Sequence, residues 1–234
     1  MRARPRGRAV GGFSIFDFMT RPTKTPVKQR RTTEQAALNY VQSRDPKRYK
    51  RTPQEEAFVR GWLQKLPKNA LVFDCPCGVG RFVNTALEMG LRYVGGDVAL
   101  PMIQHARKVS DASSVLGFIS SDAEQLPLRD DSVDCVMLWR LLHHISDEAT
   151  RMRMLREAAR VSRGMVLVSF HHPLSFTFLR RLVQRVFTGD WEICDITHWR
   201  LRREAAACGL EMVETKGFNK YVSINWFAYL RKTR

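Results

Sequence analysis

The sequence of 234 residues predicts an α/β domain built on a mainly parallel, seven-stranded sheet that ends in an antiparallel hairpin. Five short runs of β-branched and aromatic residues alternate with amphipathic segments of helical length. This alternation is typical of right-handed strand–helix–strand units around a buried parallel sheet. Two further strand-like runs follow near the C-terminal end and predict the hairpin.

Each predicted element has a span in the sequence. The five parallel strands are expected over 70–74, 92–97, 115–120, 132–139 and 165–170. The helices between them are expected over 82–90, 101–109 and 147–162. The antiparallel pair is expected over 209–218 and 221–232, joined by a turn around Asn219, and Thr197 is expected to cap a helix that ends at Gly209.

The chain is long enough for one α/β domain with appendages. Residues 1–32 carry nine Lys or Arg against one acid, which predicts a flexible basic arm. Residues 33–69 are helical in pattern, and Phe58, Trp62 and Leu66 share one face that should pack on the sheet. Residues 70–234 then form the main domain, with an insertion over 171–198 that is a candidate lid.

The charge balance points to anionic partners. A formal net charge of +16 and a pI near 10.3 favour RNA, DNA or the surface of an anionic membrane, although they also favour solubility. The cysteine count of five is odd and no secretory signal is visible, which indicates a reducing compartment and a cytoplasmic location. No apolar run is long enough to predict a transmembrane helix.

The stretch LVFDCPCGVGRF, residues 71–82, joins the first strand to the first helix. Asp74 ends the strand, and Gly78 and Gly80 allow a sharp turn that brings the backbone close to a ligand at a helix N-terminus. Cys75 and Cys77 could instead indicate a metal or redox pair. Their spacing is CxC and no second pair follows, so we predict that they fill the loop and that no metal binds.

The next two strand tips are also acidic. The second predicted strand ends at Asp97, which is placed to accept hydrogen bonds from both hydroxyls of a ribose. The third is followed by Asp122 and Ala123, within reach of an adenine ring. Three successive tips therefore predict a site for an adenosine-containing cofactor.

In these motifs the sequence resembles the class I S-adenosylmethionine-dependent methyltransferases of the type 11 group. The resemblance rests on FDCPCGVGRF, VGGDVALPMIQHAR, SSDAEQLPLRDDSVDCVMLW and LLHHISDEATRMRMLREAARVSRGMVLVSF, in this order. It covers about residues 70–170 and implies a Rossmann-like, doubly wound sheet with S-adenosyl-L-methionine as cofactor. A dinucleotide-binding fold is disfavoured because the pattern GxGxxG is absent.

The resemblance implies a role for each matching residue. Asp74 and the Gly78/Gly80 loop would hold the methionine end of the cofactor, Asp97 the ribose, and Asp122 the adenine amino group with Ala123 nearby. The same comparison makes further residues candidates for cofactor contact: Cys77, Val98 and Trp139. Pro76 departs from the family pattern, which usually has glycine there. Because proline has no N–H, we expect the later N–H groups of the loop to contact the ligand.

Methyl transfer mainly requires alignment of the nucleophile with the methyl group, and a general base only if the acceptor must lose a proton. Candidate bases lie after the fourth and fifth strands: His143, His144, His171 and His172. Packing against or capping the next helix is the favoured reason for His143 and His144, whereas for His171 and His172 a structural and a catalytic role are equally supported. The spacing of the two pairs does not predict a zinc site.

The sequence leaves three functions open. A small-molecule or lipid-precursor methyltransferase is favoured by the single domain and by the insertion, where Phe178, Leu182 and Val186 are interleaved with arginines. An RNA methyltransferase is favoured by the net charge of +16 and the basic arm. A protein that binds the cofactor without catalysis is the third. Peripheral contact with an anionic membrane is compatible with the arginine-rich insertion.

Overall fold

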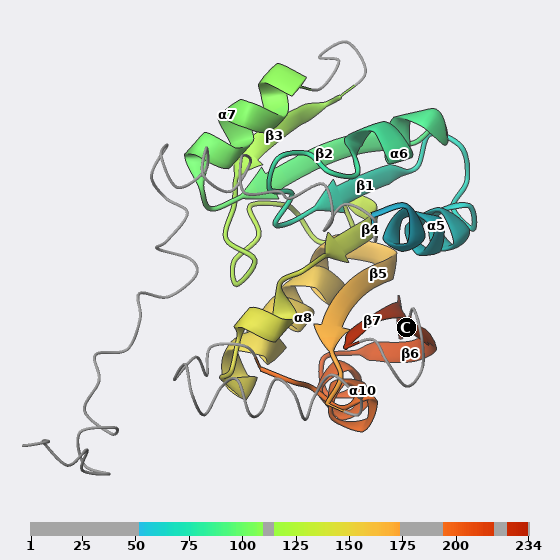
Figure 1. Cartoon of the computed structure of the whole chain (residues 1–234), viewed down its shortest axis with the longest axis vertical. Helices are drawn as coiled ribbons and strands as arrows, with labels where there is room; N and C mark the ends of the chain where they lie inside the picture. The colour runs from blue at the N-terminus through green and yellow to red at the C-terminus, as the bar shows by residue number, and fades with distance from the viewer. Residues whose placement is uncertain (1–51, 110–114, 174–193, 218–223, 234) are drawn as a thin grey trace, which may run out of the picture.

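The computed structural model describes residues 52–109, 115–173, 194–217 and 224–233. Their seven strands form one sheet in the order β3-β2-β1-β4-β5-β7-β6 (Figure 1). The predicted arm over 1–32, the helical pattern before residue 52, most of the insertion and the turn around Asn219 lie outside the described residues.

The strand predictions are confirmed, with ends that differ by a few residues. The strands are β1 (Leu71–Asp74), β2 (Arg92–Asp97), β3 (Gly117–Ser120), β4 (Val133–Leu138), β5 (Ser162–His171), β6 (Leu210–Gly217) and β7 (Asn225–Lys232). Strands β1 to β5 pair in parallel. Strand β7 runs antiparallel between β5 and β6, which places the predicted hairpin at the edge of the sheet.

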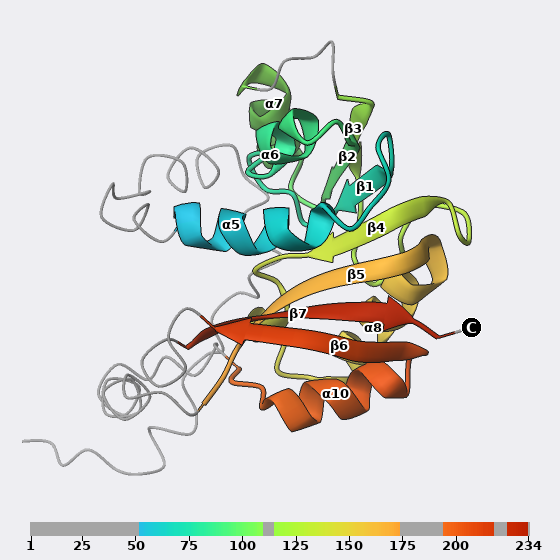
Figure 2. The same cartoon turned by 90° about the vertical axis from the view of Figure 1, so that its right-hand side faces the viewer.

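Helices cover both faces of the sheet, as Figures 1 and 2 show from two sides. The helices are α5 (Thr52–Leu63), α6 (Val83–Glu88), α7 (Leu100–Val109), the short 3-10 helix η1 (Leu142–His144), α8 (Glu148–Val161) and α10 (His198–Ala206). Helices α5, α6 and α7 contribute to one hydrophobic core, and α8 and α10 contribute to a second. The sheet separates these two cores, which is the doubly wound arrangement that the sequence predicts.

Helix α5 packs through the face that its sequence predicts. Trp62 is fully buried, and Phe58 and Leu66 pack against the same core. The Trp62 indole N–H also donates to a Glu214 carboxylate oxygen of β6 at 2.6 Å. An apolar stripe and this hydrogen bond therefore both help to hold α5 on the sheet.

The two glycines of β2 allow neighbouring residues to pack closely on this strand, and Gly95 faces the loop after β1. A Cβ atom at Gly95 would lie 2.6 Å from the Phe118 ring and 3.0 Å from the Cys77 sulfur. A Cβ atom at Gly96 would lie 2.8 Å from the Phe73 ring. A side chain at Gly95 would therefore push Cys77 and the loop away from β2, and a side chain at Gly96 would collide with Phe73 of β1.

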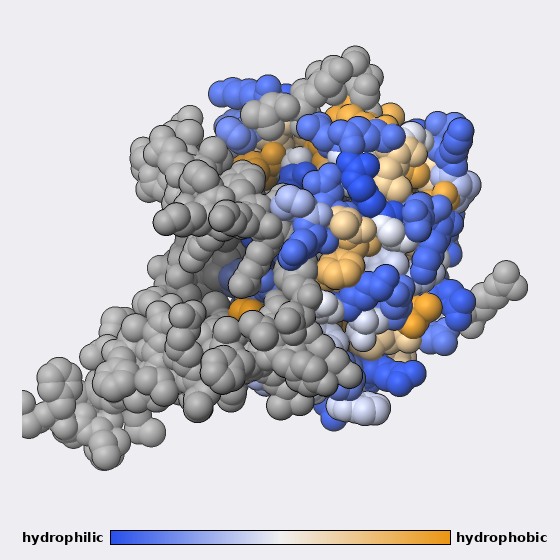
Figure 3. Space-filling view, turned by 45° about the vertical axis from the view of Figure 1, so that its right-hand side comes forward, coloured by the Kyte–Doolittle hydropathy of each residue, from blue (hydrophilic) through white to orange (hydrophobic). Residues whose placement is uncertain are grey.

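Hydrophobic side chains are scattered among hydrophilic ones on the face of the molecule in Figure 3. The large exposed hydrophobic residues among those described come from different elements: Val98, Leu100, Leu116, Trp199 and Val213. In the part of the chain that the structure describes, the helices are too short or too polar to cross a membrane.

Helix α8 is tied to α10 by a buried ion pair. Arg151 and Glu204 are fully buried, and the Arg151 guanidinium donates to both Glu204 carboxylate oxygens at 2.9 and 2.5 Å. Arg151 Nη1 also donates to the carbonyl oxygens of Ile145 and Ser146, each at 2.9 Å. One side chain thus holds two helices together with the loop that precedes α8.

We expect Arg151→Met to lower the free energy of unfolding by about 3 kcal/mol, because the buried Glu204 carboxylate would lose its bidentate partner. Urea denaturation measures the change. Arg153→Met is the control on the same helix: its side chain is 49% exposed and pairs with Glu124, so the loss should stay below about 1 kcal/mol. Equal losses in the two variants would contradict this account. Adding Glu204→Leu to Arg151→Met should restore part of the stability.

Candidate cofactor and acceptor site

The chain order reverses at β1, which pairs with β2 on one side and with β4 on the other. In sheets of this kind, ligands bind outside the carboxyl ends of the strands at such a reversal. The loop after β1 crosses this point: the Cys75 N–H donates to the Met137 carbonyl at 2.9 Å and the Cys77 N–H to the Gly96 carbonyl at 2.7 Å. The loop is thereby attached to the strands on both sides of β1.

Gly78 and Gly80 have φ values of +56° and +76°, in the left-handed region that favours glycine. The Gly80 N–H donates to the Cys77 carbonyl at 3.1 Å, which closes the turn. The N–H groups of Cys77, Gly78 and Gly80 are all bonded within the protein. We expected the N–H groups after Pro76 to contact the ligand, and for these three residues the structure shows intramolecular partners instead.

Asp97 braces the loop from the tip of β2. One carboxylate oxygen accepts the Gly78 N–H at 2.9 Å, and the other accepts the Ala99 N–H at 2.8 Å. The side chain is nearly buried, with 6% of its surface exposed. A carboxylate oxygen can accept more than one hydrogen bond, so these two bonds do not exclude a ligand from Asp97.

A cavity of about 120 Å³ lies next to this brace, at the ends of β2, β3 and β4. A site for one water molecule needs about 10–15 Å³ in this measure, so the cavity is several times larger than a single-water site. Its wall is formed by Cys75, Pro76, Asp97, Val98, Ala99, Ser121, Asp122, Ala123, Glu124, Arg140, Leu141, His144, Ile145 and Met154.

The wall includes five of the predicted site residues: Asp97, Val98, Asp122, Ala123 and His144. The other predicted residues lie in the surrounding structure and are not part of the wall: Asp74, Cys77, Gly78, Gly80, Trp139, His143, His171 and His172. The peptide bond between Cys75 and Pro76, both in the wall, is cis. The structure therefore brings the acidic tips of β2 and β3 to one cavity, together with the loop after β4.

Comparison with known proteins agrees with this geometry. A family described as "Methyltransferase domain" matches residues 73–168. The chain is 29% identical over 113 residues to tRNA (carboxymethyluridine(34)-5-O)-methyltransferase of Arabidopsis thaliana, a match that covers 47% of the chain and 26% of that protein. It is 33% identical over 116 residues to malonyl-[acyl-carrier protein] O-methyltransferase of Xylella fastidiosa (strain M23), covering 47% of the chain and 38% of that protein.

Among solved structures, magnesium protoporphyrin IX methyltransferase of Synechocystis PCC 6803 with bound SAH superposes with a TM-score of 0.64. The sequence identity is 18%, and the match covers 77% of this chain and 83% of that one. Residues 73–168 match a methyltransferase domain, and the fold is that of the S-adenosylmethionine-dependent methyltransferases. The region that matches the two curated relatives spans 26% and 38% of their lengths.

In the methyltransferase domain Asp74 is buried below the loop. Its side chain is 1% exposed, and one carboxylate oxygen accepts the Tyr93 hydroxyl at 2.8 Å. Burial raises the pKa of Asp74 to about 7, and the nearby Asp97 charge adds to this effect, while the Tyr93 hydrogen bond opposes it. The other carboxylate oxygen has no hydrogen-bond partner among the described residues.

The side chains of Cys77 and Trp139 belong to the hydrophobic core. Cys77 is 4% exposed and Trp139 is 3% exposed. The Trp139 ring stacks on Phe227 with centroids 4.9 Å apart and meets the edge of Phe82 at 5.4 Å. Contact of these two residues with a cofactor would therefore come from their backbones. Cys75 and Cys77 are free thiols whose pKa values are raised by burial.

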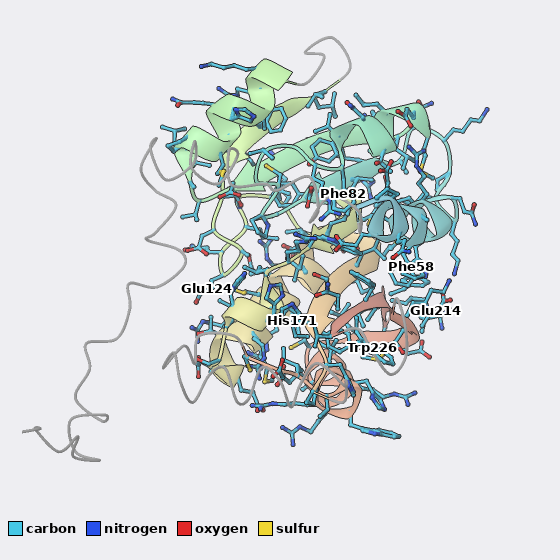
Figure 4. All side chains as sticks on the ribbon, in the orientation of Figure 1. Phe58, Phe82, Glu124, His171, Glu214 and Trp226 are labelled. Atoms are coloured by element: carbon cyan, nitrogen blue, oxygen red, sulfur yellow. The ribbon has the colours of Figure 1, made fainter. Side chains whose placement is uncertain are left out.

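The predicted histidines form two groups at the ends of β4 and β5. The His143 ring stacks on His171 at 3.8 Å between centroids and contacts His144 at 4.2 Å. The other group is His172 with His198, whose Nε2 and Nδ1 atoms lie 3.1 Å apart, beside the Trp226 ring. His171 and Trp226 are labelled in Figure 4.

His198 was missed by the sequence analysis. The signal available was its place immediately after the Thr197 cap, whose hydroxyl accepts the Arg200 N–H at 3.2 Å as predicted. The residues just before Thr197 contact the chain after β4 and the end of β5. The Cys194 N–H donates to the His143 carbonyl, and the Ile196 N–H donates to the His171 carbonyl. Among the described residues, His, Cys, Asp and Glu side chains form no group of three that could hold a metal ion.

The raised pKa of Asp74 predicts a pH dependence of stability. Between about pH 4 and pH 7 the folded state keeps a proton that the unfolded state has lost, so stability falls as the pH rises. Asp74→Asn removes this pH-dependent contribution to the free energy of unfolding. As the pH rises, the stability of the variant relative to the wild type should therefore increase by at most about 1.4 kcal/mol per pH unit, and it should level off above pH 7. Urea denaturation of both proteins between pH 4.5 and 8 measures it. A constant difference across this range would refute the assignment.

Proposed function

We propose that this chain transfers the methyl group of S-adenosyl-L-methionine to a small-molecule or lipid-precursor acceptor. The observation that carries the proposal is one cavity whose wall includes Asp97, Asp122 and His144. This combination supports a cofactor next to the carboxylates and an acceptor next to His144.

The proposal also gives each predicted cofactor residue a contact. Asp97 would accept the ribose hydroxyls, and Asp122 with Ala123 would contact the adenine ring. Asp74 and the Gly78/Gly80 loop would lie beside the methionine end. The Asp122 side chain is itself oriented, because one of its oxygens accepts the Glu124 N–H at 3.1 Å.

The reaction would be an in-line displacement. The acceptor atom attacks the methyl carbon, the carbon–sulfur bond breaks, and the electron pair stays on sulfur in S-adenosylhomocysteine. The protein must mainly align the two partners and exclude water. An acceptor that carries a proton also needs a base, and His144 is our candidate because it is the predicted histidine in the cavity wall.

The second candidate function is RNA methylation. It is favoured by the net charge of +16 and by the similarity to a relative named as a tRNA methyltransferase. Basic residues contribute to RNA affinity through phosphate contacts, which makes that affinity strongly dependent on salt.

S-adenosylhomocysteine should bind to the protein, and Asp97→Ala should weaken this binding about tenfold or more, because the ribose and the Gly78 loop both lose their acceptor. Isothermal titration calorimetry measures both affinities. Asp130→Ala is the control, since Asp130 precedes β4 at the opposite edge of the sheet and is exposed. Undisturbed binding to Asp97→Ala would refute the ribose assignment.

The two acceptor classes predict different products. With methyl-labelled cofactor, the small-molecule proposal predicts transfer to a metabolite or lipid extract that depends little on salt and survives deletion of residues 1–32. Transfer to total RNA that falls steeply between 50 and 200 mM salt and weakens in the deletion variant would support RNA methylation instead. Cofactor binding without transfer to either extract would favour the non-catalytic alternative.

A further inference from the structure

Helix α5 places a buried carboxylate beside the candidate cofactor site. Glu55 is 1% exposed. One of its oxygens lies 2.7 Å from Arg140 Nη2, and the other lies 2.5 Å from Arg81 Nη1. The second oxygen also accepts the Trp139 indole N–H at 3.4 Å. Because Arg81 follows the glycine loop and Arg140 follows β4, Glu55 connects the two loops that meet where the chain order reverses.

Arg140 is held in an unusual backbone conformation. Its φ is +54°, in the left-handed region that residues other than glycine seldom adopt. The Arg140 N–H donates to the Ser169 hydroxyl of β5 at 2.6 Å, which helps to fix this conformation. Residues in such conformations are concentrated at ligand sites, where the surrounding structure holds them.

The Arg140 side chain faces the cavity with spare hydrogen-bonding capacity. It forms part of the cavity wall with Leu141 and His144 and is 46% exposed. A guanidinium has five N–H donors, and within the described part of the chain the side chain of Arg140 donates to Glu55 through Nη2. Glu55 is shared with Arg81, so this carboxylate does not neutralise Arg140 fully.

We propose that Arg140, positioned by Glu55, binds a carboxylate group at the mouth of the cofactor cavity. Arginine is suited to this because its planar donors match a carboxylate in a bidentate geometry. The carboxylate comes from the methionine part of the cofactor or from an acidic acceptor. The inference rests on the proposed methyltransferase function, and it names the residue pair that would fix the orientation of one reactant.

The test compares two ligands that differ in the carboxylate-bearing part. 5′-Methylthioadenosine keeps the nucleoside and sulfur of S-adenosylhomocysteine but lacks its amino-acid group. If Arg140 binds the methionine carboxylate, Arg140→Gln should weaken the binding of S-adenosylhomocysteine by about 10- to 100-fold. The affinity for methylthioadenosine should stay the same. Glu55→Gln should shift the ratio of the two affinities in the same direction, which a general loss of stability would not do. Calorimetry measures the affinities of both ligands for the wild type and for the two variants.

If the carboxylate belongs to the acceptor, Arg140→Gln should leave the affinities for S-adenosylhomocysteine and methylthioadenosine unchanged. Propionate should then bind to the wild-type complex with S-adenosylhomocysteine and fail to bind to the variant complex. The control is Arg153→Gln, because Arg153 has a similar exposure of 49% and pairs with Glu124 of the cavity wall. It should change none of these affinities.

Two failures can be told apart. If the wild-type protein binds neither methylthioadenosine nor S-adenosylhomocysteine, the proposed function fails. If both bind but Arg140→Gln changes neither the ratio of their affinities nor the binding of propionate, the proposed function stands and this inference is overturned.

Discussion

The site depends on one hydrogen-bonded carboxylate, that of Asp97. It joins the tip of β2 to the glycine loop through Gly78 and to the start of α7 through Ala99. These bonds need a close approach of the loop to β2, which the absence of a side chain at Gly95 allows. The same carboxylate that would bind a ribose therefore also shapes the loop beside it, so cofactor geometry and loop geometry are coupled.

The opposite side of the cavity is fixed by contacts between elements that are far apart in sequence. Glu55 of α5 reaches the loops after β1 and β4, and Arg151 of α8 holds the carbonyl groups of Ile145 and Ser146 while it pairs with Glu204 of α10. Buried charges of this kind are stable only when each is well paired. The loop after β4 is consequently held by helices from both faces of the sheet. At the tip of β2, by contrast, one side chain, Asp97, makes the contacts itself.

Local patterns in the sequence were sufficient to predict the sheet and the acidic strand tips. A buried parallel strand is a short apolar run, and an aspartate at its end is visible without knowledge of the fold. Glu55, Arg151 and His198 could not be identified in this way, because a helical glutamate, arginine or histidine has no distinctive pattern, and its role depends on a partner dozens of residues away. Trp139 shows that a local pattern can also suggest too much. Its position at a strand tip suggested ligand contact, whereas its ring is packed between Phe82 and Phe227.

The histidines differ in what they can do chemically. His144 is in the cavity wall, whereas His172 lies in the second group beside His198 and Trp226. Burial and the neighbouring His198 lower the pKa of His172, so its imidazole is neutral near pH 7 and can share one proton with the His198 ring. An acceptor carboxylate would need no base, because it is already ionised at neutral pH. If Arg140 binds an acceptor of this kind, His144 would orient the acceptor and the reaction would proceed without proton transfer to the protein.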